Sequence, residues 1–450
     1  MLSSENTRMN VSVIGLGKLG APMAAVFAAK GHRVVGLDTN LALVTAIEEG
    51  RAPVEEPRLQ DMIDDGKGRL QATTDYDRLV RETEISFIIV PTPSDSSGAF
   101  SNEYVLAAIG KLGAALRNKK TYHVVAVTST VMPGATGGPI REALERASGR
   151  SVGPNLGLAY NPEFIALGSV VNNMLNPDFL LIGESDSRAG QMVESVYEVV
   201  CENKPPSRRM NFVNAELSKI SVNTFVTTKI SYANMLADIC DRLPGADVEI
   251  VTAAIGSDTR IGRKYLRGAV GYGGPCFPRD NVAFATLASA LGANADIARA
   301  TDTINRYQIE RLANAVKTRV SEGARVAILG LSYKPDTSVV EESQGVLLAS
   351  RLYNDGFAVI IHDPMAAGAA QRILASSVVY ADSAEDALRD ADIGVLVTPW
   401  PEYAKLANVA LPKQVPVIDC WRMLSGNGQG SVLPIWIGYG DTPKDALMRS

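Results

Sequence analysis

Cysteine and histidine are scarce in this chain of 450 residues. Its four cysteines include no C-x-x-C pair, and there are only three histidines. Scattered cysteines argue against a disulfide framework and against a zinc site, and so few histidines argue against a histidine-based metal centre. We therefore expect no metal, and thiols that stay reduced, as they do in the cytoplasm.

Long apolar runs and an excess of positive charge are also missing. No apolar segment is long enough to span a bilayer, and the polar first ten residues do not suggest a signal peptide. The formal net charge of −5 argues against nucleic acid and anionic membranes as partners. With 46% hydrophobic and 21% charged residues, the chain is typical of a globular protein with two or three domains. We expect a cytoplasmic enzyme.

A glycine turn near the start lies between a predicted strand and a predicted helix. The strand is Val11–Ile14, the turn is Gly15-Leu16-Gly17-Lys18-Leu19-Gly20, and a second strand, Arg33–Leu37, is closed by Asp38. In this context G-x-G-x-x-G indicates a dinucleotide site with the pyrophosphate at the helix N-terminus. Asp38 would accept hydrogen bonds from a ribose diol and repel a 2′-phosphate, so we predict NAD rather than NADP. A tight turn in another kind of α/β protein is the alternative.

Further strands are predicted at 84–90, 123–127 and 157–160, each followed by polar residues. The carboxyl ends of parallel strands meet at one edge of a sheet, where such sheets bind ligands. Helices are then expected over 215–243, 247–255 and 284–307.

A second strand-rich unit begins at Arg325, and its turn, Gly330 to Lys334, lacks the three-glycine pattern. We expect this unit to bind a different nucleotide. The predicted fold class is α/β, with two Rossmann-like domains joined by a central all-helical region that contains a long helix. The expected domains are 1–205 for NAD, 206–312 for the helical region and 313–450 for the second nucleotide.

The segment from Gly271 to Asp280, GYGGPCFPRD, places a cysteine directly after a run of glycines. Pro278 suits the first turn of a helix, so Cys276 would lie near a helix N-terminus, where peptide dipoles favour a thiolate. Asp280 would follow one turn later on the same face. A glycine-rich turn with a buried, inert thiol is the alternative.

Seven separated motifs together resemble the NAD-dependent nucleotide-sugar 6-dehydrogenases, the UDP-glucose branch in particular. The resemblance runs from about Val11 to Arg422. The motifs are the glycine turn with Asp38, Ser129-Thr130-Val131, Asn161-Pro162-Glu163-Phe164, Glu216-Leu217-Ser218-Lys219 with Asn223, Arg260-Ile261-Gly262, the cysteine segment, and Gly330 to Lys334.

The resemblance implies a four-electron oxidation of a sugar 6-hydroxymethyl group to a carboxylate, with two NAD+ and one water. Cys276 would be the nucleophile, forming a hemithioacetal and then a thioester. Asp280 and Lys219 would polarise the water or alkoxide and stabilise the oxyanion, and Asn223, one helical turn from Lys219, would share that work.

Glu163 would activate the water that hydrolyses the thioester, and Thr130 would help to place it. From the residues alone each has a structural alternative. Lys219 could be a surface lysine, Asn223 a packed helix amide, Glu163 a helix cap and Thr130 a turn residue.

The resemblance also implies two larger sets of contacts. The cofactor set is Gly15, Gly17, Lys18, Leu19, Gly20, Asp38, Thr92, Thr130, Glu163 and Arg279. The substrate set is Ala159, Tyr160, Asn161, Pro162, Glu163, Lys219, Asn223, Arg260, Tyr265, Leu266, Arg267, Gly268, Ala269, Gly273 and Lys334. Arg260 would reach the substrate of a neighbouring subunit, which implies at least a dimer built on the long helix; a surface arginine is the alternative.

Residues beside Cys276 help to indicate which sugar nucleotide is the substrate. Relatives that act on UDP-N-acetylhexosamines carry a histidine before the cysteine, whereas here it is Pro275, as in the UDP-glucose and GDP-mannose type. Three positions depart from the family pattern: Leu43 and Glu341 stand where basic residues near the cofactor are expected, and Trp421 stands where an arginine is expected.

UDP-glucose is accordingly the expected substrate and UDP-glucuronate the expected product. Three alternatives remain: the same chemistry on GDP-mannose or a UDP-N-acetylhexosamine, a two-electron dehydrogenase that does not need Cys276, and a non-catalytic relative with a weakened NAD site.

Overall fold

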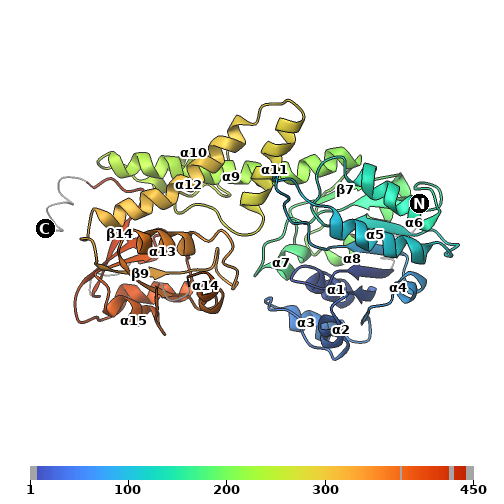
Figure 1. The fold of residues 1–450 in the computed structure, drawn as a ribbon, viewed down its shortest axis with the longest axis horizontal. Helices are drawn as coiled ribbons and strands as arrows, with labels where there is room; N and C mark the ends of the chain where they lie inside the picture. Colours follow the sequence, from blue (N-terminus) through green and yellow to red (C-terminus); the bar gives the residue numbers. More distant parts are fainter. Residues whose placement is uncertain (1–7, 375–377, 425–429, 442–450) are drawn as a thin grey trace. The chain divides into compact units, whose positions relative to one another are not determined.

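The computed structural model describes residues 8–374, 378–424 and 430–441. It divides into two compact units, Met1–Ser221 and Val222–Ser450. Figure 1 labels their elements. None of the described helices is both long and apolar enough to cross a membrane.

The first unit is built on an eight-stranded sheet with the order β3-β2-β1-β4-β5-β6-β7-β8. All neighbouring strands are parallel except β6 and β7. The order of its first six strands is that of a dinucleotide-binding Rossmann sheet. The strands are β1 Asn10–Ile14, β2 Arg33–Leu37, β3 Leu70–Thr73, β4 Ile85–Ile88, β5 Val124–Val127, β6 Gly157–Tyr160, β7 Leu180–Glu184 and β8 Ser207–Met210.

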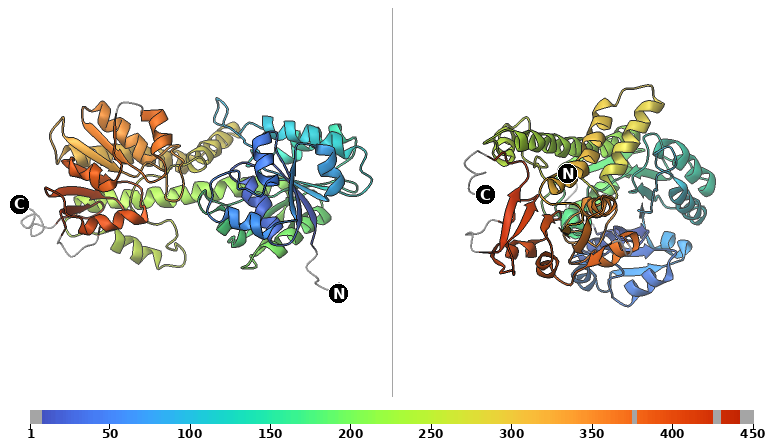
Figure 2. Two further views of the ribbon diagram at one scale, coloured as in Figure 1. Left: turned by 90° about the horizontal axis from the view of Figure 1, so that it is seen from below. Right: turned by 60° about the vertical axis from the view of Figure 1, so that its left-hand side comes forward.

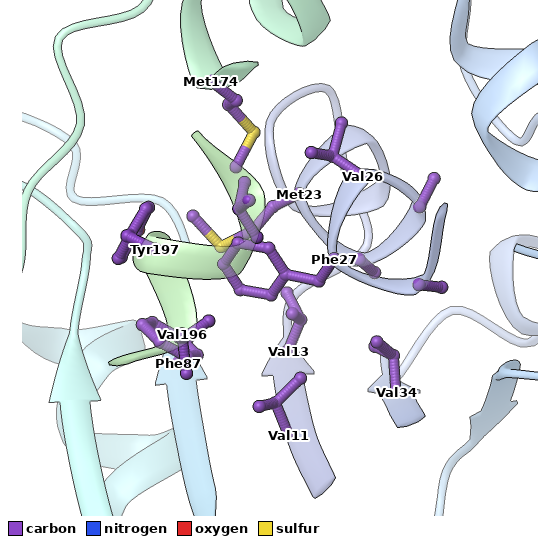
Figure 3. Close-up of a cluster of buried hydrophobic side chains, with 14 of the residues drawn as sticks. Val11, Val13, Met23, Val26, Phe27, Val34, Phe87, Met174, Val196 and Tyr197 are labelled. Atoms are coloured by element: carbon purple, nitrogen blue, oxygen red, sulfur yellow. The ribbon is translucent and has the colours of Figure 1, made fainter. Parts of the chain in front are cut away.

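Helices cover both faces of this sheet, because most of its strands are apolar on both sides. Residues of α1, α7 and α8 form one core, and residues of α5 and α6 form the other. Figure 3 shows the first core, with Phe27 of α1 beside Phe87 and Tyr197. The helices are α1 Gly20–Ala29, α2 Leu41–Glu48, α3 Leu59–Asp65, α4 Tyr76–Glu82, α5 Glu103–Leu116, the π-helix η1 Thr136–Ile140, α6 Arg141–Ser148, α7 Val170–Leu175 and α8 Ser187–Val200.

The long helix predicted over 215–243 is confirmed as α9, Phe212–Arg242. It is a single helix of 31 residues, which the left view of Figure 2 shows along much of its length. Buried polar residues of α9, among them Asn234, hydrogen-bond to neighbouring segments. Large apolar side chains also remain exposed on it, Phe225 and Ile239 among them.

The second unit combines helices with a six-stranded parallel sheet of order β11-β10-β9-β12-β13-β14. This is the strand order of a second Rossmann-like sheet, so the predicted fold class is confirmed. The strands are β9 Arg325–Leu329, β10 Ala358–His362, β11 Val379–Tyr380, β12 Ile393–Leu396, β13 Val415–Asp419 and β14 Val432–Trp436. The helices are α10 Val248–Gly256, α11 Phe277–Ala290, α12 Asp296–Lys317, α13 Gln344–Asn354, α14 Ala367–Leu374, α15 Ala384–Arg389 and the 3-10 helix η3 Pro401–Asn408.

One predicted helix was wrong. The segment 284–307 is not continuous: α11 ends at Ala290 and α12 begins at Asp296. Between them Gly292 has a φ of +67°, a left-handed conformation that ends helices. The alanine-rich sequence on both sides of Gly292 favours helix and hides the break.

Candidate active site

The glycine turn of the first unit is shaped by close backbone contacts. A Cβ on Gly15 would lie 2.3 Å from the carbonyl oxygen of Ile89, and one on Gly20 would lie 1.8 Å from that of Gly15. Gly17 is different, since nothing lies within 4 Å of its Cβ position. Two glycines are therefore required by the turn itself, while Gly17 leaves the room that a pyrophosphate needs beside the N-terminus of α1.

Asp38 lies directly after β2, half-buried. Its Oδ2 accepts from the Leu16 N–H at 2.7 Å and its Oδ1 from the Asn40 N–H at 2.8 Å. These bonds hold a carboxylate beside the glycine turn, where a ribose diol could donate to it and a 2′-phosphate would be repelled. The residues present fit NAD.

The ends of β4 and β5 carry two further predicted cofactor residues of this unit, while Lys18 and Leu19 lie in the glycine turn itself. Thr92 follows β4 and is buried, and Thr130 follows β5 and is half-buried. Sequence reasoning named Ser129 only within a motif, yet its Oγ accepts from the Val90 N–H at 2.9 Å and donates to the Val90 carbonyl at 2.7 Å. Ser129 thus ties together the two strand ends that precede the threonines.

Glu163 follows β6 and is contacted by two side chains of the same unit. The Tyr197 hydroxyl is hydrogen-bonded to its carboxyl Oε1, and Lys219 Nζ donates to its backbone carbonyl at 2.6 Å. Burial raises the pKa of Glu163, while the Tyr197 hydrogen bond and the charge of Lys219 lower it. A carboxyl whose pKa is shifted toward neutrality is suited to take a proton from water.

Lys219 is 6% exposed, so it is not a surface lysine. Its Nζ lies 4.4 Å from the centre of the Phe164 ring. Glu163 is no helix cap either, because the backbone N–H groups of Gly168 and Val170 at the start of α7 donate to Glu56 instead.

In the second unit Cys276 occupies the N-cap position of α11, and Pro278 lies in the first turn, as predicted. The Asp280 N–H donates to the Cys276 carbonyl at 2.8 Å, which places Asp280 one turn along. Cys276 is exposed, so the buried-thiol alternative is wrong. An accessible thiol at a helix N-terminus is in the setting of a reactive thiolate.

Asp280 is 1% exposed and has two partners in this unit. Asn223 Nδ2 donates to its Oδ2 at 2.6 Å, and Arg279 forms an ion pair with its Oδ1 at 3.5 Å. Asn223 is therefore more than a packed helix amide.

The backbone before Cys276 is held by contacts that sequence reasoning did not foresee, and one of the partners, Asn305, was not named at all. Asn305 of α12 binds both backbone groups of Tyr272, accepting from N–H at 2.7 Å and donating to C=O at 3.0 Å. A Cβ on Gly273 would lie 2.3 Å from the Glu342 carbonyl oxygen, and one on Gly274 would lie 2.6 Å from the Tyr333 ring. No local pattern marks these distant partners.

The predicted substrate residues 265–269 form a loop that Asn234 holds from α9. Asn234 Oδ1 accepts from the Ala269 N–H and its Nδ2 donates to the Val270 carbonyl, both at 2.9 Å. Tyr265 is exposed with a φ of +62°, and Leu266 is buried. The remaining substrate candidates lie in three places. One group lies in the strand β6 and the segment after it. Arg260 has a side chain that is 87% exposed, and Lys334, after β9, is half-buried.

The three departures take part in ordinary contacts. Leu43 packs against the first core. Glu341 contributes its backbone carbonyl, which accepts from the Gly274 N–H at 2.9 Å, while its side chain is exposed. Trp421 donates its indole N–H to the Val397 carbonyl at 2.6 Å, and Arg267 donates to the Trp421 carbonyl at 2.5 Å.

The second glycine turn is built differently from the first. Asp363, at the position after β10 that Asp38 takes after β2, is 5% exposed. Its Oδ2 accepts from Leu331 N–H at 2.7 Å, Ser332 N–H at 2.9 Å and Trp400 Nε1–H at 3.1 Å. Donors of the protein itself thus occupy this carboxylate oxygen, and one of them is the indole of Trp400, whereas the hydrogen bonds described above for Asp38 come from backbone N–H groups.

The Rossmann sheet, the open Gly17 and the placed Asp38 define the class of the protein as an NAD-binding Rossmann protein. The chain belongs to the UDP-glucose/GDP-mannose dehydrogenase family, whose members are NAD-dependent nucleotide-sugar 6-dehydrogenases. Residues 9–201 match that family's NAD-binding domain, 213–307 its central domain and 327–426 its UDP-binding domain.

Individual relatives agree with this assignment. A UDP-glucose 6-dehydrogenase of Haloferax volcanii is 37% identical over 88% of this chain and 93% of its own length. A GDP-mannose 6-dehydrogenase of Pseudomonas savastanoi pv. phaseolicola is 31% identical over 91% of this chain and 95% of its own. A solved UDP-glucose dehydrogenase from the hyperthermophilic archaeon Pyrobaculum islandicum superposes with a TM-score of 0.88 at 33% identity, covering 98% of this chain and 100% of that one.

Proposed function

We propose that this protein oxidises the 6-hydroxymethyl group of UDP-glucose to a carboxylate, giving UDP-glucuronate with two NAD+ and one water. The observation that carries the proposal is the exposed thiol of Cys276 at the N-terminus of α11, one turn before the buried Asp280. A two-electron dehydrogenase has no use for such a nucleophile.

In the proposed reaction the Cys276 thiolate adds to the sugar aldehyde and forms a hemithioacetal, whose oxidation leaves a thioester. Asp280 and Asn223 act as a pair because one is hydrogen-bonded to the other. They hold the water or alkoxide from which the first proton is taken.

In the same proposal Glu163 takes a proton from the water that hydrolyses the thioester, and Thr130 helps to place that water. Lys219 stabilises negative charge on the substrate oxygen, a role that suits a buried ammonium group. Gly15, Gly17, Gly20 and Asp38 would hold NAD+, which, when bound, accepts the hydride in each of the two oxidations.

The choice of UDP-glucose rests on Pro275 before the cysteine and on the similarity to UDP-glucose dehydrogenases. GDP-mannose dehydrogenases at about the same identity as several UDP-glucose enzymes make GDP-mannose the alternative. A panel of UDP-glucose, GDP-mannose and UDP-N-acetylhexosamines with NAD+ distinguishes them by NADH release and by the mass of the product.

The number of NADH molecules released per sugar tests whether the oxidation takes two steps. Two NADH per sugar are expected, and one NADH per sugar would instead indicate the two-electron alternative. Cys276→Ser should form no acid while binding NAD+ as tightly as the wild type, because the glycine turn lies elsewhere in the sequence. Normal UDP-glucuronate formation by this variant would contradict the mechanism.

We also propose that the protein is at least a dimer through α9. Several large side chains spaced along this helix are exposed in the single chain, which supports an apolar contact surface; among them are Phe225 at 66%, Tyr232 at 47%, Met235 at 38% and Ile239 at 51%. Arg260 would then act on the substrate of a neighbouring subunit. Light scattering gives the mass, and Phe225→Asp should shift it towards the monomer, whereas a monomeric wild type would end the proposal.

A further inference from the structure

A buried tyrosine, to which the proposed chemistry assigns no role, contacts the proposed hydrolytic base. Tyr197 lies in α8 and is 1% exposed. Its hydroxyl is hydrogen-bonded to Glu163 Oε1 and also lies 2.8 Å from Asn161 Oδ1. Glu163 and Asn161 flank a proline after β6, so one hydroxyl from another element joins two side chains of this segment.

The ring of Tyr197 is fixed in the first core. It makes edge contacts with Phe27 and Phe87, with ring centres 5.7 and 6.2 Å apart and interplanar angles of 89° and 85°. Figure 3 shows the three residues in one cluster. Because a ring held on two sides cannot swing away, the hydroxyl oxygen stays beside Glu163.

The number of available protons limits the hydrogen bonds that Tyr197, Glu163 and Asn161 can form with one another. Asn161 Nδ2 donates to the Leu181 carbonyl at 3.1 Å, which turns its Oδ1, an acceptor only, towards Tyr197. Tyr197 has one proton for two acceptors. When Glu163 is ionised, either Glu163 or Asn161 goes without that proton; when Glu163 is protonated, it donates to Tyr197, which donates to Asn161, and every group is satisfied.

Among the residues that the structure describes, Lys219 of α9 and Cys201 at the end of α8 are the further titratable groups that interact with Glu163 or Tyr197. Lys219 lowers the pKa of Glu163, and burial raises the pKa of the Cys201 thiol to about 12, so this thiol stays neutral. Burial, followed by the charge and hydrogen bond of Glu163, raises the pKa of Tyr197 well above its ordinary value. Tyr197 therefore keeps its proton and acts only by redirecting it.

We propose that Tyr197 is a positioning residue that holds the Glu163 carboxyl group and accommodates the proton that Glu163 takes from water, by turning its own O–H from Glu163 to Asn161. The inference rests on the proposed function, in which Glu163 is the hydrolytic base. In that step a water O–H bond breaks and its proton goes to Glu163. The water oxygen bonds to the thioester carbon, the C–S bond breaks, and the Cys276 thiolate leaves with the electron pair.

Tyr197→Phe tests the proposal because it removes one oxygen and keeps the ring. The ionised Glu163 then loses a charge-assisted hydrogen bond, whereas the protonated form loses only weaker neutral ones, so the pKa of Glu163, which the Tyr197 hydrogen bond lowers, rises. We expect the pH profile of thioester hydrolysis to move up by about one unit and hydrolysis near neutral pH to slow roughly tenfold. NADH should still appear in a fast burst, and a covalent adduct on Cys276 should accumulate and be seen by intact-protein mass spectrometry.

Tyr122→Phe is the matched control. Tyr122 also donates to a carboxylate of the first unit, Asp186, at 3.3 Å, but neither residue is among the proposed site residues. This variant should keep the wild-type pH profile. A shift equal to that of Tyr197→Phe would mean that loss of any such hydroxyl disturbs the unit, and would overturn the proposal.

Asn161→Leu gives a prediction of opposite sign. With the competing acceptor gone, Tyr197 donates to Glu163 alone, so the pH profile should move down. Shifts in the same direction for Tyr197→Phe and Asn161→Leu, or no shift in either, would overturn the proposal. If Tyr197→Phe does not fold, Asn161→Leu alone still decides, since only a downward shift of the pH profile supports the proposed turning of the Tyr197 O–H between Glu163 and Asn161.

Infrared titration separates this inference from the proposed function. The carboxyl band that disappears in Glu163→Gln reports the pKa of Glu163 without any turnover. If this pKa moves as predicted in the two variants but the wild type releases one NADH per sugar, the hydrogen-bond switch stands and the proposed function fails. If the wild type releases two NADH and this pKa does not move, the role of Tyr197 is wrong.

Discussion

Asn223 donates its amide N–H to the carboxylate of Asp280 over 2.6 Å, and Asp280 is 1% exposed. Its other oxygen faces Arg279 only at 3.5 Å. Removing the amide by Asn223→Ala leaves a buried charge with a weaker set of partners. We expect the free energy of unfolding to fall by about 1.5–3 kcal/mol, measured by urea denaturation.

Asn294→Ala is a suitable control for that change. Asn294 Nδ2 also donates to a carboxylate, that of Asp296, at 2.7 Å, but this pair is exposed. The Asn294 Oδ1 also accepts from the Asp296 N–H at the start of α12, so loss of this side chain should lower the free energy of unfolding by about 0.5–1 kcal/mol, less than the loss expected for Asn223→Ala. Equal losses of unfolding free energy in the two variants would show that the burial of Asp280 does not strengthen the contribution of its hydrogen bond to stability.

The cysteines differ in accessibility, which gives a second prediction. Cys201, Cys240 and Cys420 are buried with exposed fractions of 8%, 4% and 2%, and burial raises the pKa of each. Cys276 is exposed. Iodoacetamide should therefore modify one thiol per native chain and four per denatured chain, as counted by mass spectrometry.

Cys276→Ser should take up no label in its native state. Labelling of a second thiol in the native wild type at a comparable rate would contradict the burial of the other three. Slower labelling in the presence of UDP-glucose would support the place of Cys276 in the substrate site.

The parts of the site that sequence reasoning predicted are those with a local cause. The glycine turn before α1 and the N-cap position of Cys276 depend on residues within a few positions, such as Pro278. Local patterns carry that information because turns and helix starts are decided over short distances.

The parts that sequence reasoning missed depend on distant partners. Tyr197 meets Glu163 across 34 residues, and Asn305 meets Tyr272 across 33. Tyrosine and asparagine within helices give no sign of such contacts. The break at Gly292 was missed for a related reason, because a single left-handed glycine outweighs the helix preference of the alanines around it.

Histidine burial predicts how stability depends on pH. Desolvation lowers the pKa of all three histidines, His32, His123 and His362, with the largest reduction at fully buried His123. Below about pH 6.5 the unfolded chain therefore binds more protons than the folded chain. The free energy of unfolding should fall as pH drops below 6.5, by up to about 1.4 kcal/mol per pH unit for each histidine.

Urea unfolding from pH 8 to 5 measures this slope. His123→Gln should make this slope shallower by the contribution of one histidine, up to about 1.4 kcal/mol per pH unit, whatever the variant's stability at pH 8. Raised pKa values at Glu163 and Glu216 act in the opposite direction, since the folded chain holds those protons more tightly. A slope that His123→Gln leaves unchanged would show that His123 does not contribute.

Arg58 gives a prediction about backbone strain. It precedes α3 with a φ of +66° and a ψ of 0°, a left-handed conformation that costs most side chains about 1 kcal/mol or more and glycine almost nothing. Comparing Arg58→Gly with Arg58→Ala isolates this cost, because both remove the same charge. We expect the glycine variant to be more stable by about 1 kcal/mol in urea unfolding.

At Lys111 the same two substitutions should give the opposite order of stability, with the alanine variant more stable than the glycine variant. Lys111 is exposed within α5, where glycine is less stable than alanine by about 1 kcal/mol. The difference between glycine and alanine should therefore reverse between the two positions. If alanine were the more stable residue at both, Arg58 would not be left-handed in solution, and the start of α3 would have to differ from the conformation described above.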